Sequence, residues 1–399
     1  LYLAHRIPFP PNKGDKIRSF NALRHLSSRH NVYLAAFIDD AEDWQHVERL
    51  GEYCAELFVR PVGGWRSGVS ALSAMLHGQS LSVGYYKDRA MQEWLSSVVA
   101  SQDISVAIAF SSTMAQYLPF ADTGDLVLIA DFVDLDSDKW RQYSMRSWWP
   151  KSLIYAYEAA ALKRWEQAVL RRVGAVTLVS DEERRLMLET DASAGSKVHV
   201  VRNGVDTDYF DPGRQMESPY RAGIQNIVFT GAMDYYANAE GVAWFVESVW
   251  PGIRARRANA QFWIVGSNPT REVLALSSMP GVTVTGRVAD VRPYLKFADV
   301  AVAPLRLARG VQNKVLEALA MNIPIVAAPQ ALQGLDENPP SSVSVAAEPG
   351  EFASAVLRRI EGGSRTAGER GRTYVAEHFD WKTNLEEFSE IASSLNPAV

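Results

Sequence analysis

The chain has 399 residues, 47% of them hydrophobic, so it is too long for one ordinary core and too apolar to be disordered. We therefore expect two domains. Its 41 basic and 46 acidic residues nearly balance, which argues against a general nucleic-acid binder.

Cysteine usage and hydropathy favour a cytoplasmic protein. The single cysteine, Cys54, cannot form an internal disulfide, and we expect a core thiol in a reducing compartment. No stretch approaches the ~20 apolar residues of a membrane span. The first residues, Leu-Tyr-Leu-Ala-His-Arg, predict a strand and a loop rather than a signal peptide.

Short apolar strands alternate with amphipathic helical stretches from the start of the chain, which is the pattern of parallel sheets covered by helices. The first series of predicted strands comprises residues 2–4, 32–37, 55–59, 106–110, 126–130, 175–179 and 198–201. The second series comprises 227–230, 262–265, 282–285, 300–303, 323–327 and 343–346. Helices are predicted between these strands at 239–257, 272–278, 291–297 and 351–361, with one more starting near Gly310.

The segment 203–223 separates the two series, because it is polar and carries glycine and proline. It predicts a domain boundary, with residues 1–205 on one side and 206–380 on the other. Asn203-Gly204 within it also fits an ordinary turn, and the sequence alone does not decide between a turn and a ligand contact.

Polar loops follow several predicted strands at their carboxyl ends, where parallel sheets bind ligands. The first strand is followed by Lys13-Gly14-Asp15-Lys16, and the second series supplies Gly231, Gly266 and Gly286-Arg287. A single glycine there fits an ordinary turn as well as a ligand site. The repetition at successive strand ends favours a ligand site.

The most informative stretch runs from Gly310 to Glu317 and follows the predicted strand 300–303. A helix start with glycine, an amide and an ammonium group, outside a strand's carboxyl end, is suited to bind an anion. Asn313, Lys314 and Glu317 fall on one side of this predicted helix. A carboxylate one turn deeper is placed to accept hydrogen bonds from sugar hydroxyls. The pattern predicts a site for a nucleoside diphosphate.

Six blocks of the chain resemble a known family in residue content and order. They are PPNKGDKIRSF (10–20), DFVDLDSDKW (131–140), RNGVDTDYF (202–210), FTGAMDYYAN (229–238), VTGRVADVRPYL (284–295) and APLRLARGVQNKVLEALAM (303–321). The chain resembles retaining glycosyltransferases of family four, and more closely the sugar transferases of exopolysaccharide clusters linked to exosortase and PEP-CTERM systems. The resemblance covers nearly the whole chain.

The resemblance implies an α/β protein of the GT-B fold, with two facing Rossmann-like domains, a cleft between them and a C-terminal helix, 381–399, that crosses back. The C-terminal domain would hold a nucleotide-sugar donor and the N-terminal domain the acceptor, which in this family is lipid-linked or a saccharide. Retention would follow from front-face transfer, in which the leaving phosphate takes the acceptor's proton. Neither a cofactor nor a metal is expected.

Individual site residues follow from the same resemblance. We expect backbone groups of Gly310, Val311 and Asn313 on the diphosphate, Arg309 and Lys314 on its charge, and Glu317 on the ribose. The list of further donor contacts from both domains is Lys13, Gly14, Lys16, Gly231, Gly266 and Arg287. Each of the three cations near the second-domain site also fits a solvated surface charge.

Three positions depart from the family pattern. Arg309 stands where the family has the first of two glutamates, and Ala232 stands where it has an arginine. Ser111-Ser112 stand where a histidine is common, so no catalytic base carries over. The departures leave Arg287, Arg309 and Lys314 as the sources of positive charge.

On the acceptor side we expect Asp131, at the end of strand 126–130, and Trp140. Asp131 belongs to a cluster with Asp134, Asp136 and Asp138, and oxygen-rich clusters of this kind also hold magnesium or manganese. Aspartates in such a loop more often cap or turn the chain. We therefore assign no metal site.

Residues 139–172 contain eight basic and two acidic residues. Four tryptophans lie in the same segment: Trp140, Trp148, Trp149 and Trp165. Aromatic rings with basic neighbours suit the headgroup layer of an anionic membrane, which places the protein at the inner face of the membrane. The alternative is that the tryptophans fill the core and the basic side chains are solvated, which leaves the protein free in the cytoplasm.

Two other functions remain open at this stage. A non-catalytic nucleotide-sugar binding subunit is consistent with the changed positions 309 and 232. A dinucleotide-dependent oxidoreductase is disfavoured, because no clear G-x-G-x-x-G follows a first strand. Thermal protection by uridine or guanosine diphosphate, as opposed to nicotinamide cofactors, separates the two nucleotide-sugar hypotheses from the oxidoreductase.

Overall fold

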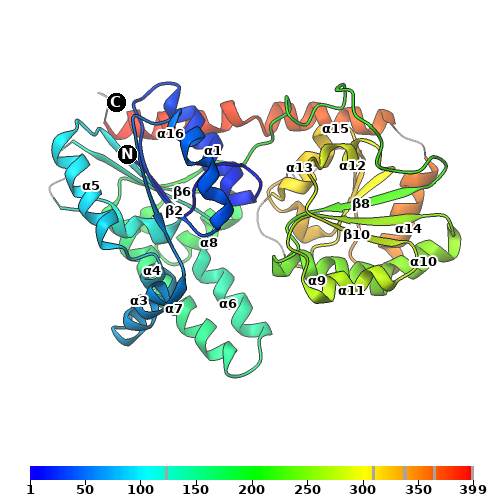
Figure 1. Cartoon of the computed structure of the whole chain (residues 1–399), viewed down its shortest axis with the longest axis horizontal. Coiled ribbons are helices and arrows are strands. Elements are labelled where there is room, and N and C mark those ends of the chain that lie inside the picture. The colour runs from blue at the N-terminus through cyan, green and yellow to red at the C-terminus, as the bar shows by residue number, and fades with distance from the viewer. Residues whose placement is uncertain (122–124, 308–310, 336–338, 363–364, 397–399) are drawn as a thin grey trace. The chain divides into compact units, whose positions relative to one another are not determined.

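The computed structural model describes residues 1–121, 125–307, 311–335, 339–362 and 365–396 (Figure 1). The chain divides into two compact units, Leu1–Arg202 with Leu385–Val399, and Asn203–Asn384. Each unit contains one parallel sheet with helices on its faces. In each unit, strands and helices alternate along the chain, which is the Rossmann-like arrangement.

The first unit contains a seven-stranded parallel sheet in the order β3-β2-β1-β4-β5-β6-β7. Its strands are β1 (Tyr2–Ala4), β2 (Tyr33–Ile38), β3 (Glu56–Pro61), β4 (Val106–Phe110), β5 (Val127–Val133), β6 (Ala175–Leu178) and β7 (Val198–Val200). These seven strands confirm the first predicted series. The interior strand β1 is buried throughout, as expected for a strand covered by helices on both faces.

Helices and short turns connect these strands. The α-helices are α1 (Gly14–Ser27), α2 (Val47–Gly51), α3 (Gly64–Leu76), α4 (Leu81–Tyr85), α5 (Arg89–Ser101), α6 (Asp136–Arg146), α7 (Lys151–Arg172) and α8 (Asp181–Leu188).

Two buried glutamates of α7 fix the starts of other helices, because carboxylates satisfy free N–H groups there. Glu158 accepts from the backbone N–H groups of Leu81 and Ser82 at α4, and Glu166 accepts from that of Ser137 at α6.

The second unit contains a six-stranded parallel sheet in the order β10-β9-β8-β11-β12-β13. Its strands are β8 (Asn226–Thr230), β9 (Gln261–Val265), β10 (Val282–Gly286), β11 (Val300–Ala303), β12 (Ile325–Ala327) and β13 (Val343–Val345). They confirm the second predicted series. Its core includes the rings of Phe245 and Phe262, whose centroids lie 4.5 Å apart.

The helices of the second unit begin close to the predicted positions. They are α9 (Tyr236–Trp244), α10 (Trp250–Arg256), α11 (Arg271–Ala275), α12 (Arg292–Lys296), α13 (Asn313–Ala320), α14 (Pro349–Glu361) and α15 (Arg365–His378). The single helix predicted at 239–257 is instead α9 and α10 joined by the π-helical turn Phe245–Val249. Pro251, which cannot donate a backbone hydrogen bond, lies in the first turn of α10.

The last helix, α16 (Trp381–Leu395), starts in the second unit, and its residues from Leu385 onward belong to the first unit. Asp380 caps it by accepting from the backbone N–H of Thr383 at 2.8 Å. In the first unit Glu386 pairs with Arg29, which follows the end of α1. None of the helices in the described residues combines the length and apolar composition that a bilayer span requires.

Candidate functional site in the second unit

Four neighbouring strands of the second sheet, β10, β9, β8 and β11, end side by side. Because they are parallel, the residues that follow them lie along one edge of the sheet. Gly286 ends β10, while Gly266 and Gly231 directly follow β9 and β8. The structure therefore brings the three predicted glycines together at the carboxyl edge, where parallel sheets bind ligands.

The backbones of these glycines contact one another directly. Gly231 N–H donates to Val265 O at 3.1 Å, and Gly266 N–H donates to Gly286 O at 3.2 Å. A Cβ atom on Gly266 would lie 1.6 Å from the carbonyl oxygen of Gly231. Only glycine fits at Gly266, so this edge exposes backbone where side chains would otherwise stand.

We predict that Gly266→Ala lowers the free energy of unfolding of the second unit by about 1–3 kcal/mol, because backbone must move to admit the new methyl group. Urea unfolding would measure this change. Gly252→Ala in α10 is the matched control, since a Cβ there meets Ala353 Cβ at 3.6 Å, an ordinary contact. Equal stability of the two variants would contradict the close packing of the glycine edge.

Helix α13 begins at Asn313, later than the predicted start near Gly310. Gln312 precedes it with extended backbone, φ −84° and ψ 123°. The first-turn N–H groups of the helix therefore belong to Asn313 and Lys314. Val311 is 6% exposed and packs in the core, which leaves only its backbone for a ligand. Arg309 and Gly310 lie outside the described residues.

Lys314 extends from α13 toward the end of β8. Its Nζ donates to Asn238 Oδ1 at 3.1 Å and lies 5.4 Å from the centroid of the Phe229 ring. Asn238 is fixed in turn, because its Nδ2 donates to Ala232 O at 2.8 Å. A Cβ on Gly231 would contact both Asn238 and Lys314. Sequence reasoning did not assign Asn238, although it ends the block FTGAMDYYAN.

Burial shifts the titration of both charged residues of α13. It lowers the pKa of Lys314 to about 8, and the charge of Glu317 opposes that shift. It raises the pKa of Glu317 to about 7, and the charge of Lys314 opposes that shift. Among the described residues, the buried Oδ1 of Asn313 has no hydrogen-bond partner. This helix start therefore holds a desolvated cation and an unsatisfied acceptor, which bound ligand groups would complement.

An aromatic–guanidinium stack lies on the Glu317 side of α13, and sequence reasoning did not find it. Arg292 stacks at 3.9 Å on the ring of Tyr209 and forms an ion pair with Asp290 at 2.7 Å. Burial raises the pKa of Tyr209, and the charges of Asp290 and Glu317 add to that shift. Arg287, which follows β10 in the same loop region, is exposed.

The structure places two predicted contact residues of the first unit in buried ion pairs, which argues against their contact with a ligand. Lys16, predicted on the phosphates, is 2% exposed, and its Nζ donates to Asp43 Oδ2 at 2.5 Å. Asp131, predicted to face the acceptor, is 1% exposed and accepts two 2.9 Å hydrogen bonds from Arg18. Thr177 Oγ1 also donates to Asp131 Oδ1 at 2.8 Å. Neither charge is available to a ligand without breaking a buried pair.

The other predicted residues of the first unit stay predictions. Lys13 precedes α1, and Gly14 is its exposed first residue. Trp140 is partly buried and packs on Tyr155, with ring centroids 5.1 Å apart. Trp165 donates its Nε1–H to Ser112 O at 2.8 Å. In the portion of the chain that is described, no three His, Cys, Asp or Glu side chains are grouped to hold a metal ion.

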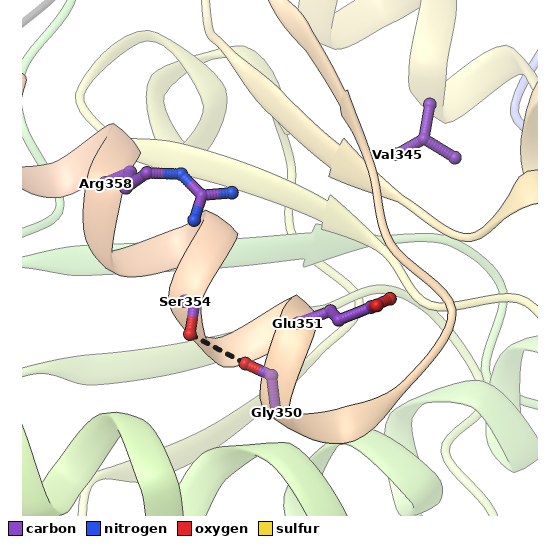
Figure 2. A pocket seen from close by; sticks show the side chains of 5 residues that line it. All are labelled: Val345, Gly350, Glu351, Ser354 and Arg358. Atoms are coloured by element: carbon purple, nitrogen blue, oxygen red, sulfur yellow. Dashed lines mark hydrogen bonds between the residues drawn. The ribbon is translucent and has the colours of Figure 1, made fainter.

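A separate open hollow of about 520 Å³ lies where β13 leads into α14. Figure 2 shows the five residues that line it: Val345, Gly350, Glu351, Ser354 and Arg358. Its one drawn hydrogen bond, from Ser354 Oγ to Gly350 O at 2.8 Å, is internal to α14. None of the predicted site residues within the described ranges lines this hollow, so the candidate site lies elsewhere.

Residues 224–361 match the family described as "Glycosyl transferases group 1". No curated protein matches the chain significantly. Similar solved structures include Anabaena HepE with UDP, 13% identical over 98% of this chain and 99% of that chain, with a TM-score of 0.68.

Two further structures are as similar. Sucrose-phosphate synthase from Thermosynechococcus elongatus is 14% identical over 100% of this chain and 99% of its own, with a TM-score of 0.71. WaaG, a glycosyltransferase involved in lipopolysaccharide biosynthesis, is 14% identical over 99% of both chains, with a TM-score of 0.65. The chain thus has the GT-B fold and carries a glycosyltransferase group 1 domain over residues 224–361.

Proposed function

We propose that this protein is a retaining glycosyltransferase that moves a sugar from a nucleotide diphosphate sugar to a lipid-linked or polysaccharide acceptor in exopolysaccharide biosynthesis. The second unit binds the donor, and the first unit provides the acceptor side. The group 1 domain supports donor use, as do the HepE structures in complex with UDP and with UDP-glucose. The acceptor class and the pathway rest on the resemblance of the six sequence blocks.

The observation that carries the proposal is the position of Lys314. Its ammonium group lies at the start of α13 and is held by Asn238 beside Gly231. A diphosphate at this point would face the positive end of the helix, the Lys314 charge and an edge with no side chains in the way. Glu317, one turn further along, is then placed for the ribose hydroxyls.

In the proposed mechanism the protein positions groups and stabilises charge rather than forming a covalent intermediate. The bond between the anomeric carbon and the β-phosphate oxygen breaks while the acceptor oxygen bonds to the same face, and the leaving phosphate takes the acceptor's proton. Lys314 and the α13 N–H groups stabilise the negative charge that develops on the leaving diphosphate. This route needs neither a metal nor a cofactor.

Turnover with a panel of nucleotide sugars and a polyprenyl-phosphate-linked acceptor tests the proposal, with released nucleoside diphosphate as the readout. We expect one donor to give acceptor-dependent release and a glycosylated lipid. Tight donor binding without release for any acceptor would instead identify a non-catalytic nucleotide-sugar binding subunit, which the changed positions 232 and 309 would then explain.

Donor use should depend on pH through Lys314. Because burial lowers the pKa of Lys314 to about 8, the residue loses its positive charge as the pH rises through that value. We therefore expect kcat/KM for the donor to fall between about pH 7 and about pH 9. Lys314→Arg stays charged over this range and should not show the fall. The same fall in both proteins would assign the titration to another group.

We also propose that the protein acts in the cytoplasm at the inner face of the membrane, where lipid-linked acceptors are found. The basic segment 139–172 supports this placement. Of its four tryptophans, Trp148 and Trp149 are 91% and 77% exposed, while Trp140 and Trp165 are partly buried. The exposed pair, between α6 and α7, is the part suited to the lipid headgroup layer.

A further inference from the structure

Helix α3 of the first unit exposes its large apolar side chains to solvent. Trp65, Val69, Leu72 and Leu76 follow one another at steps of four, three and four residues, so they form one stripe along the helix. Their exposed fractions are 75%, 58%, 55% and 78%. Surface helices of globular proteins normally turn such a stripe inward.

The inner face of α3 consists of small residues. Ala74 is buried, while Ser70 and Ala71 are partly buried. They pack so closely on α4 that a Cβ atom on Gly84 would lie 2.4 Å from Ala74 Cβ. This contact leaves no room for larger residues on the inner face. The orientation of α3 is therefore set by close packing of small residues, and its large apolar residues remain uncovered.

The end of α3 is fixed to α7, next to the exposed turn between α6 and α7. Tyr157 Oη donates to Met75 O at 3.0 Å and to Gln79 O at 2.9 Å. Figure 1 shows α3 and the α6–α7 hairpin projecting from the same end of the first unit. One turn before Tyr157, Leu153 and Ile154 are 61% and 47% exposed. The apolar surface thus extends from α3 to the start of α7.

The two segments of the chain that carry this surface have an excess of basic residues. Residues 57–87 contain no acidic residue, and neither do residues 140–157. The basic residues in these two segments are Arg60, Arg66, Lys87, Arg141, Arg146 and Lys151. Arg60 and Arg141 pair with Asp88 and Asp138, which lie just outside these segments. Apolar and tryptophan side chains in segments with a basic excess complement an anionic bilayer, because the acyl chains accept the apolar groups and the headgroups attract the basic groups.

We propose that the exposed stripe of α3, together with Trp148, Trp149, Leu153 and Ile154, is a membrane-docking surface that inserts into the headgroup layer of an anionic bilayer. This inference deepens the membrane placement proposed above, because it adds α3, which lies outside segment 139–172, to the exposed residues within that segment. Docking through α3 brings the first unit, the acceptor side of the proposed reaction, to the surface that holds lipid-linked acceptors.

Sedimentation with vesicles tests the surface. The full chain would be mixed with vesicles of phosphatidylglycerol and phosphatidylethanolamine, or with phosphatidylcholine alone. We expect binding to the anionic vesicles and at least about tenfold weaker binding of Val69→Asp/Leu72→Asp, because two charges then face the acyl region. Tryptophan fluorescence gives a second readout, since insertion of the exposed Trp65, Trp148 and Trp149 shifts the emission of the unaltered protein to shorter wavelength.

Leu274→Asp is the matched control, because Leu274 is 48% exposed on α11 of the second unit. It should bind vesicles like the unaltered protein. Undiminished vesicle binding by the α3 double variant would overturn the proposal. A dimer of the unaltered protein that the double variant abolishes would also overturn it, because a second copy of the chain would then cover the stripe. Donor hydrolysis without vesicles should be equal in all three proteins, so loss of docking is distinguishable from failure of the proposed activity.

Discussion

Lys314→Ala should lower kcat/KM for the nucleotide-sugar donor by about 100-fold while the protein stays folded. The variant removes the one ammonium group that the described structure places at the start of α13, where it is held by Asn238 at 3.1 Å. Charge on the departing diphosphate would then develop in a desolvated site without its cation. Steady-state kinetics with released nucleoside diphosphate as the signal measures the loss.

Two companion variants make this result specific. Glu317→Ala should also weaken donor use, mainly through KM, because its proposed contact is with the ribose and not with the reacting bond. Lys382→Ala, at an exposed lysine near the start of α16, should leave the kinetics unchanged. Unaltered kcat/KM in both the Lys314 and the Glu317 variants would remove the proposed roles of α13.

Asp131→Ala should lower the free energy of unfolding of the first unit by about 3–5 kcal/mol, because it leaves the Arg18 guanidinium buried without its counter-ion. Both side chains of this pair are 1% exposed, and Arg18 also donates to Val201 O at 2.8 Å. The expected effect is on stability, which differs from the acceptor role that the sequence predicted. Urea unfolding measures it.

The double variant Arg18→Met/Asp131→Leu should be more stable than Asp131→Ala, since it removes both buried charges together. Glu93→Ala serves as the surface control, because its pair with Arg89 is largely exposed and contributes little. A stable Asp131→Ala protein with a raised acceptor KM would contradict the structural role and restore the original prediction.

The strands could be predicted from the sequence because parallel strands buried on both faces form short apolar runs between polar turns. Val106–Phe110 and Val300–Ala303 match their predicted ranges, and most other ends differ by one or two residues. The start of α13 was predicted too early, because glycine and valine at 310 and 311 carry no capping signal that marks a helix start.

The site residues could be predicted where their position follows from neighbouring residues in the sequence. They could not be predicted where their role depends on a partner far away in the sequence. Gly231 and Gly266 follow apolar strands, so their place at the sheet edge could be inferred. Lys16 and Asp131 were likewise expected in polar loops after strands, but they lie in α1 and β5. Their partners Asp43 and Arg18 are 27 and 113 residues away in the sequence. The sequence alone gave no sign that these charges were already paired.

The exposed face of helix α3 also could not be predicted from the sequence. Its apolar spacing predicts an amphipathic helix, and the usual inference is that the apolar stripe faces the core. The close approach of Ala74 to Gly84 reverses this orientation, and that contact depends on the packing of α4 under Glu158. Residue periodicity identifies a stripe but not the element that covers it.

The most direct test of the proposed donor site is a crystal structure of the protein with a bound nucleoside diphosphate. The proposal predicts the diphosphate at the start of α13, within hydrogen-bond distance of Lys314 Nζ, and the ribose hydroxyls on Glu317. A nucleotide bound instead at the end of β1, or in the hollow beside α14, with the start of α13 unoccupied, would contradict it.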